Sequence, residues 1–220
     1  MKEAVKLSLA LGITCALAAS ILSFGQNKTL AARQRAEMRQ RESALRLVLP
    51  DFDNKPVTDK IVVESEGKTF TFYKASQNDR IVALAGEGES RGFGGNIKLL
   101  VGLQTDGTIR TVMVTEHKET PGLGTQATDR KEKHSFWDLF RHSVPQNDPK
   151  PAPAFAPCQY LDQYAEKKLM AKNAPFHVQQ DKGVVTAVSG ATVSSRAVAK
   201  GISQICLAYE THRDAIFAEK

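Results

Sequence analysis

Apolar residues recur every three or four positions near the C-terminal end of the chain, at Val198, Ile202, Ile205 and Tyr209. Because this spacing places them on one side of a helix, we predict an amphipathic helix over about 195–212 with one buried stripe. The small and hydroxylic residues just before it form a turn that opens directly into the helix. This turn places a threonine at the helix start.

Five shorter runs carry the residue types and the alternation that are typical of strands. They lie at 61–64, 69–74, 81–85, 97–103 and 108–115. The Asp106-Gly107 pair between the last two runs predicts a tight hairpin. We therefore expect an α+β fold: one mixed α/β domain with a largely antiparallel sheet, preceded by a single N-terminal transmembrane helix.

The N-terminal segment contains 18 residues without a charge, at 7–24, and two lysines precede them. This length just reaches that of a membrane-spanning helix. A cleaved signal peptide is the alternative, since Ala16-Leu17-Ala18 fits a small-x-small cleavage site. We favour a retained anchor, because Ile21, Leu22 and Phe24 extend the apolar run to the full spanning length.

The composition of the residues after the anchor predicts a polar helix over 29–48, which ends at Pro50. We expect short helices near 134–142 and 159–172, with a proline-rich surface insertion at about 143–157 between them. The expected organisation is an N-terminus with the anchor at 1–25, a linker helix at 26–49, a domain at 50–212 and a tail at 213–220.

The net charge of +6 is concentrated at the N-terminal end, where residues 1–49 contribute +5. An anionic lipid surface or a partner subunit explains this better than nucleic acid, for which no motif is present. Counting charges on either side of the anchor would place the domain in the cytoplasm.

The cysteines and histidines give little indication of a further site. In an oxidising compartment, Cys158 and Cys206 could form a disulfide. The five histidines lack metal-ligand spacing, and no catalytic arrangement is apparent, so we predict neither a metal nor a catalytic residue.

Two interpretations apply to the hydroxyl groups at the predicted helix start. The first turn of a helix has unpaired N–H groups and a partial positive charge, which favour a phosphate group. Gly190 and Ala191 would leave room for its close approach. Alternatively, Thr192, Ser194 or Ser195 is an ordinary N-cap.

Three segments resemble a family of flavin-bearing electron-transfer subunits. S-G-A-T-V-S-S at 189–195 resembles the family's S-G-A-T-x-[ST]-S motif, G-F-G-G-N-I-K-L-L-V-G at 92–102 its glycine-rich strand, and E-H-K-E-T-P-G-L-G at 116–124 its flavin loop. The family includes the G subunit of Rnf complexes and the C subunit of sodium-pumping NADH:quinone reductases. The length of the chain favours the first, and a flavin-free membrane scaffold or sensor is the alternative of another class.

The resemblance implies FMN attached as a phosphoester to Thr192 by a separate flavin transferase. It also implies a cofactor site made of three short segments. Its residues are Ser189, Gly190, Ala191, Val193 and Ser194 beside the acceptor, Glu119, Thr120, Pro121, Gly122, Leu123 and Gly124 in the loop, and Gly94 and Gly95 in the glycine-rich turn. Leu123 would contact one face of the flavin ring, while His117, Lys118 and Glu119 either tune flavin protonation or are solvated loop charges.

The resemblance further implies a membrane-anchored electron carrier that passes electrons between other subunits of an ion-translocating complex, with ferredoxin and NAD as the terminal couple. It places a short N-terminus in the cytoplasm and the domain in the periplasm, on the inner membrane. The sequence departs from the family pattern in two places: Thr186 stands where an aspartate is common, and Thr125-Gln126 stands where an acidic and a basic residue usually follow the loop.

Overall fold

The computed structural model describes residues 2–130, 156–169 and 175–218 of the 220-residue chain, without the side chains of 2–4, 21–22 and 24–32. The chain divides into two compact units, Met1–Ser43 and Ala44–Lys220. The second unit thus begins six residues before the predicted domain start at 50. Helix α4 continues to Ala218, so the predicted tail is largely helical.

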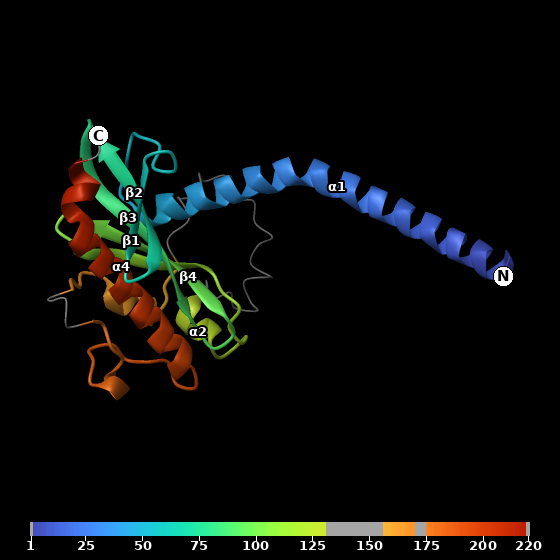
Figure 1. Ribbon diagram of the computed structural model, residues 1–220. Coiled ribbons are helices and arrows are strands. Elements are labelled where there is room, and N and C mark those ends of the chain that lie inside the picture. The colour runs from blue at the N-terminus through green and yellow to red at the C-terminus, as the bar shows by residue number, and fades with distance from the viewer. Residues whose placement is uncertain (1, 131–155, 170–174, 219–220) are drawn as a thin grey trace, which may run out of the picture. The chain divides into compact units, whose positions relative to one another are not determined.

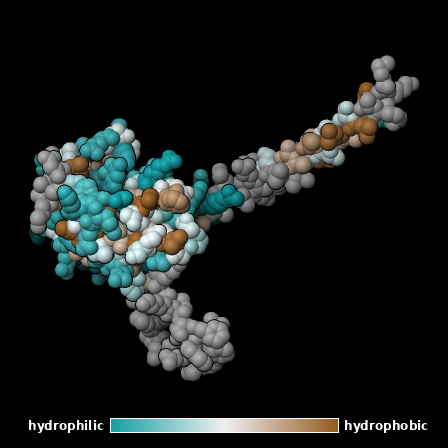
Figure 2. All heavy atoms as spheres, turned by 90° about the horizontal axis from the view of Figure 1, so that it is seen from below, coloured by the Kyte–Doolittle hydropathy of each residue, from teal (hydrophilic) through white to brown (hydrophobic). Residues whose placement is uncertain are grey.

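Helix α1 runs from Lys2 to Val48 and joins the predicted anchor and linker helix in one element. Its N-terminal part exposes large apolar side chains (Figure 2): Val5, Leu7, Leu9, Leu11, Ile13 and Leu17. Within the described part of the chain, no helix is long and apolar enough to cross a membrane. The span predicted at 7–24 is therefore not confirmed, and it includes side chains outside the described residues, at 21, 22 and 24.

Five strands form one antiparallel sheet in the order β1-β2-β3-β4-β5 (Figure 1), so all five predicted strands are confirmed. Their bounds are β1 Lys60–Ser65, β2 Lys68–Gln77, β3 Arg80–Arg91, β4 Asn96–Gln104 and β5 Ile109–Glu116. Asp106 and Gly107 lie in the β4–β5 turn, as predicted. Every strand pairs with its sequence neighbour, which makes the sheet a simple meander.

Helix α4, Thr192–Ala218, packs against one face of this sheet, mainly on β3 and β4. The four residues of the predicted stripe, Val198, Ile202, Ile205 and Tyr209, are all fully buried. Alternate residues of β4, such as Leu99 and Val101, point into the same core cluster. The helix was therefore predicted correctly, although it begins three residues earlier and ends six residues later than expected.

The opposite face of the sheet has a second core cluster. Leu100 of β4 lies in it beside Ala83 and Ala85 of β3, because successive side chains of a strand alternate between faces. The end of α1 covers this cluster with Leu45 and Val48. Both faces of the sheet are thus buried, and this explains why the central strands are apolar on both sides.

The prediction of a helix at 159–172 is wrong over the described part of that segment. Only a short 3₁₀ helix, η1, forms at Leu161–Tyr164. The chain then pairs with the start of β5: the Ile109 N–H donates to the Lys167 carbonyl, and the Glu166 N–H donates to the Ile109 carbonyl, each over 2.8 Å. These bonds to a strand edge replace the helical ones, and Glu166 takes a positive φ of 62°.

Two further short elements complete the described part of the chain: a single helical turn, α2, at Thr125–Thr128 and a 3₁₀ helix, η2, at Gln179–Asp181. The helix expected near 134–142 and most of the insertion at 143–157 lie outside the described residues. Cys158 and Cys206 are buried free thiols, so they form no disulfide with each other. Burial raises the pKa of Cys206 to about 12, which keeps this thiol protonated.

Replacing Ile205 by alanine tests how much the α4–sheet contact contributes to stability. Ile205 is fully buried in the main core cluster, and we expect Ile205→Ala to lower the free energy of unfolding by about 2–5 kcal/mol. Chemical denaturation of the full chain measures this. The control is Lys200→Ala on the exposed side of the same helix, with an expected change within about 0.5 kcal/mol. Equal effects of the two variants would contradict the described packing.

Candidate functional site

The loop that follows β5 turns sharply at Thr120–Leu123. The Leu123 N–H donates to the Thr120 carbonyl over 3.2 Å, and Gly122 has a φ of +80°. Proline at the second turn position and glycine at the third are typical of a type II turn, which needs a positive φ at the third. The Gly122 N–H donates to Thr125 Oγ1 over 2.9 Å and ties this turn to α2.

The glycine-rich turn between β3 and β4 lies directly against this loop. The Gly94 N–H donates to Oε1 of Glu119 over 3.0 Å. A Cβ atom on Gly94 would overlap the carbonyl oxygen of Lys118. At Gly94 the glycine-rich turn thus packs closely against the backbone of the loop. Its contact with a cofactor stays a prediction.

The first turn of α4 faces the same loop. The Ala191 N–H donates to the Val188 carbonyl over 3.0 Å in a turn that places Gly190 at a φ of +77°. The first helical hydrogen bond runs from the Ser195 N–H to the Ala191 carbonyl. The backbone N–H groups of Thr192, Val193 and Ser194 have no acceptor among the described residues, as is expected for a helix start without an N-cap side chain.

The three hydroxyl groups of this turn have different roles. Ser195 Oγ accepts from the Val188 N–H over 3.1 Å, so it stabilises the turn before the helix. Ser194 Oγ donates to Oε2 of Glu119. Thr192 is half-buried, and its hydroxyl has no hydrogen-bond partner in the described chain. None of the three caps α4, so the N-cap interpretation receives no support from the geometry.

A buried tyrosine pair supports the turn from behind. The Tyr160 hydroxyl donates to the Ser195 carbonyl over 2.6 Å and lies 2.8 Å from the Tyr164 hydroxyl. Burial raises the pKa of Tyr160 to about 12, so it remains a neutral donor. These contacts fix the position of the α4 N-terminus.

A pocket of about 310 Å³ lies where the three segments meet. Its lining is Phe93, Glu119, Thr120, Leu123, Gly124, Gly190, Ala191, Thr192, Val193 and Ser194. Nine of these ten residues belong to the predicted site. Ser189, Pro121, Gly122, Gly94 and Gly95 do not line the pocket; Gly94 and Gly122 instead shape the loops around it.

Phe93 is the lining residue that sequence reasoning missed. It is 73% exposed, and Leu123 and Val193 are 49% and 50% exposed. An aromatic side chain between glycines, at a turn predicted to lie against the site, was a signal that could have identified it. The pocket thus combines a half-exposed apolar rim with a helix N-terminus whose N–H groups are free, which fits a flat ligand that ends in an anion.

Positions that depart from the family pattern have structural roles here. Thr125 accepts the Gly122 N–H described above, and the Gln126 side chain donates to the Gly122 carbonyl. Thr186 is held by the side chain of Gln163, to which its backbone N–H donates over 2.8 Å. These residues stabilise the loops through neutral hydrogen bonds.

His117 supports the loop on its other side. The Glu119 N–H donates to Nδ1 of His117 over 3.2 Å, and Nε2 of His117 lies 2.6 Å from Oδ1 of Asp129. Because Nδ1 accepts, the ring proton belongs on Nε2, facing the carboxylate. His117 does not line the pocket; it holds the backbone of Glu119, which does.

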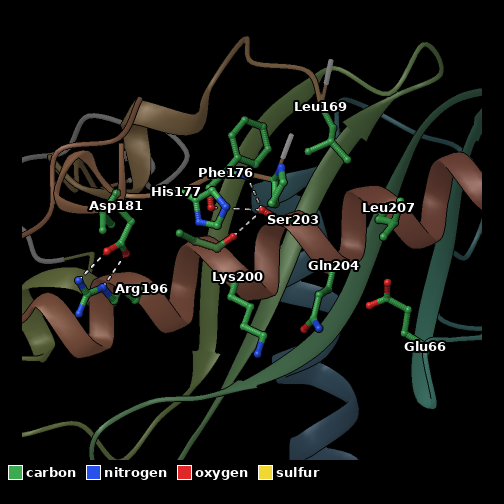
Figure 3. Close-up of a pocket in the computed structure, with 13 residues that line it drawn as sticks. Glu66, Leu169, Phe176, His177, Asp181, Arg196, Lys200, Ser203, Gln204 and Leu207 are labelled. Carbon is green, nitrogen blue, oxygen red and sulfur yellow. Dashed lines mark hydrogen bonds and ion pairs between the residues drawn. The ribbon is translucent and has the colours of Figure 1, made fainter. Parts of the chain in front are cut away.

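A second pocket, of about 450 Å³, lies along α4 between Arg196 and Leu207 and shares no lining residue with the first (Figure 3). Arg196 and Asp181 form a bidentate ion pair at one end of it, with bonds of 2.6 and 2.7 Å. Ser203 accepts the Phe176 N–H over 2.7 Å at its floor. The ion pair lowers the pKa of Asp181 and so keeps its carboxylate ionised, which balances the positive charge of Arg196.

The fold and the site therefore define an α+β domain with a pocket at the start of a helix. The model of the family described as FMN-binding domain matches residues 92–206, which include the glycine-rich turn, the loop and the first half of α4. The chain belongs to this family.

Curated relatives extend the similarity over most of the chain. It is 32% identical over 200 residues to the G subunit of the ion-translocating oxidoreductase complex of Stutzerimonas stutzeri, covering 89% of this chain and 76% of that protein. It is 26% identical to the G subunit of the proton-translocating ferredoxin:NAD(+) oxidoreductase complex of Clostridium ljungdahlii, covering 88% and 85%. Among solved structures, NqrC of Shewanella oneidensis aligns with a TM-score of 0.44 and 19% identity, over 77% of this chain and 69% of that one.

Substituting Gly94 tests whether the glycine-rich turn must lie against the loop. Since the added methyl group of Gly94→Ala would overlap the Lys118 carbonyl, we expect the free energy of unfolding to fall by about 1–3 kcal/mol. The neighbouring Phe93→Ala removes a mostly exposed side chain and should change stability by less than about 0.5 kcal/mol. Urea denaturation of both full-length variants makes the comparison, and a harmless Gly94→Ala would contradict this arrangement.

Proposed function

We propose that this chain is an electron-carrying flavoprotein subunit of an Rnf-type ion-translocating complex, with FMN attached covalently to Thr192. The observation that carries the proposal is the pocket at the start of α4. There, the hydroxyl of Thr192 and the backbone N–H groups beside it have no hydrogen-bond partner among the described residues. The relatives named as G subunits of ion-translocating complexes support the assembly, and one such name supports ferredoxin and NAD as the terminal couple.

The phosphate would lie at the first turn of α4. The N–H groups of Thr192, Val193 and Ser194 point out of the helix start, where the helix dipole favours negative charge. Ala191 and Gly190 line the pocket without bulky side chains. A phosphoester at Thr192 Oγ1 would place the phosphate oxygens within reach of these donors. A flavin transferase would make this bond by transferring the FMN part of FAD to Thr192 Oγ1: the pyrophosphate bond of FAD breaks, and AMP leaves.

The ring system would lie between the apolar side chains of the rim. Leu123 from the loop, Phe93 from the glycine-rich turn and Val193 from α4 all line the pocket and are about half or more exposed. When bound, the flavin accepts and passes on electrons, while the protein holds and orients it. A half-open rim would leave one edge of the ring accessible to partner subunits.

Replacing Thr192 by alanine tests the attachment. Coexpressed with an active flavin transferase and exported, the wild-type chain should gain the mass of one FMN less one water, as a phosphoester requires, and Thr192→Ala should gain none. Intact-mass spectrometry measures both. Thr211→Ala, the same substitution at an exposed position of the same helix, serves as control and should carry one FMN. An unmodified wild type, with the transferase active on another substrate, would favour a flavin-free scaffold.

We further propose that the N-terminal part of α1 attaches the chain to the membrane part of the complex, with the domain on the periplasmic side of the inner membrane. Six large apolar side chains between Val5 and Leu17 are 53–72% exposed, and soluble surfaces rarely carry such a set on one helix. The basic residues of the following segment would face lipid headgroups or other subunits of the complex.

Charged substitutions in this apolar segment test the attachment. We expect the wild-type chain to remain in the membrane pellet after alkaline extraction, and a double variant, Leu9→Asp with Leu11→Asp, to move to the supernatant. Met38→Asp, in the polar half of α1, is the control and should stay in the pellet. Protease added to spheroplasts should digest the domain. A wild type that is extracted, or a domain protected from protease, would each contradict the corresponding part of the proposal.

A further inference from the structure

Glu119 is a buried carboxylate inside the candidate site. Its side chain is 5% exposed and lines the pocket beside Thr192 and Leu123. Oε1 accepts from the Gly94 N–H over 3.0 Å, and Oε2 accepts from the Ser194 hydroxyl. Among the described residues, the ion pairs near this loop do not involve Glu119: Lys98 pairs with Glu116, and His117 pairs with Asp129.

The position of this carboxylate has an electrostatic consequence for anything bound in the pocket. Two donors and the start of α4 stabilise its negative charge, but no cation neutralises it among the described contacts. In a site partly shielded from water, a charge acts over several ångströms much more strongly than at the surface. A ring in the pocket would therefore experience a fixed negative charge from one side.

We propose that Glu119 is a positioning and tuning residue: it joins the glycine-rich turn to α4 and lowers the reduction potential of the flavin in this pocket. This inference rests on the proposed function. Each electron added to the ring increases its negative charge, so a neighbouring carboxylate makes reduction less favourable. Removing that charge makes the flavin easier to reduce.

Glu119→Gln tests the proposal, because glutamine keeps the shape of the side chain while it removes the charge. Its amide oxygen can still accept from the Gly94 N–H, and its amide nitrogen can donate to Ser194 Oγ. Incorporation of FMN is first confirmed by intact mass, and the midpoint potential of the full-length holoprotein is then titrated. We expect a shift to a more positive potential, equivalent to about tenfold in the equilibrium between reduced and oxidised flavin, or about 30 mV for a two-electron couple. Glu119→Asp, which keeps the charge, should have a midpoint potential close to that of the wild-type protein.

Glu116→Gln is the matched control. Glu116 ends β5, three residues before Glu119, and its exposed carboxylate lies 2.6 Å from Lys98, outside the pocket. Its removal should leave the potential unchanged. A purely structural role of Glu119 would lower thermal stability without moving the potential.

If the Glu119→Gln chain does not fold, a pair of variants at Ser194 tests the same proposal. Ser194→Ala removes one donor to the carboxylate and leaves the charge less stabilised, so the potential should become more negative, while Ser194→Thr keeps a hydroxyl and should not shift it. Flavinylated variants with the wild-type potential would overturn the tuning role and leave the proposed function intact. A wild-type chain without flavin would overturn both.

Discussion

The packing of α4 across β3 and β4 determines where everything else in the site lies. A helix of 27 residues held by a fully buried stripe cannot slide or rotate without losing contacts along its whole length. Its first turn is therefore fixed relative to the ends of β3 and β5, where the glycine-rich turn and the loop emerge. The site depends on this single helix–sheet contact, although most residues of the contact are far from the pocket.

Glu119 transmits this constraint to the loops. Its carboxylate receives one hydrogen bond from each neighbouring segment, and its own backbone N–H is held by His117. A buried carboxyl without hydrogen bonds would be strongly destabilising, so the three segments must approach one another closely enough to supply them. The glycines around the carboxylate meet the same requirement, since a Cβ atom on Gly92 or Gly124 would overlap the Glu119 side chain.

The sequence predicted the sheet and α4 well, because their periodicities are strong and local. The buried stripe from Val198 to Tyr209 and the Asp106-Gly107 turn carry their own physical explanation. The segment after η1 was predicted wrongly as helix, because its composition favours a helix while Ile109, more than fifty residues earlier, offers strand-edge hydrogen bonds that no local pattern shows. Nine pocket-lining residues were predicted through their motifs. Phe93 was missed because its exposure depends on the turn geometry.

The start of α4 also shows why a helix terminus without a cap can be worth retaining. An N-cap side chain would typically contribute about 1 kcal/mol to stability, but Ala191, the residue before the first helical one, has no hydroxyl group to supply it. The nearby hydroxyl groups do not replace it: Ser195 bonds to the preceding turn, Ser194 bonds to Glu119, and Thr192 is left without a partner in the described chain. The donors that a cap would satisfy therefore have no acceptor among the described residues. Under the proposed function they would bind the phosphate of FMN, so the same residues that leave the helix start without a cap would let a bound phosphate stabilise it.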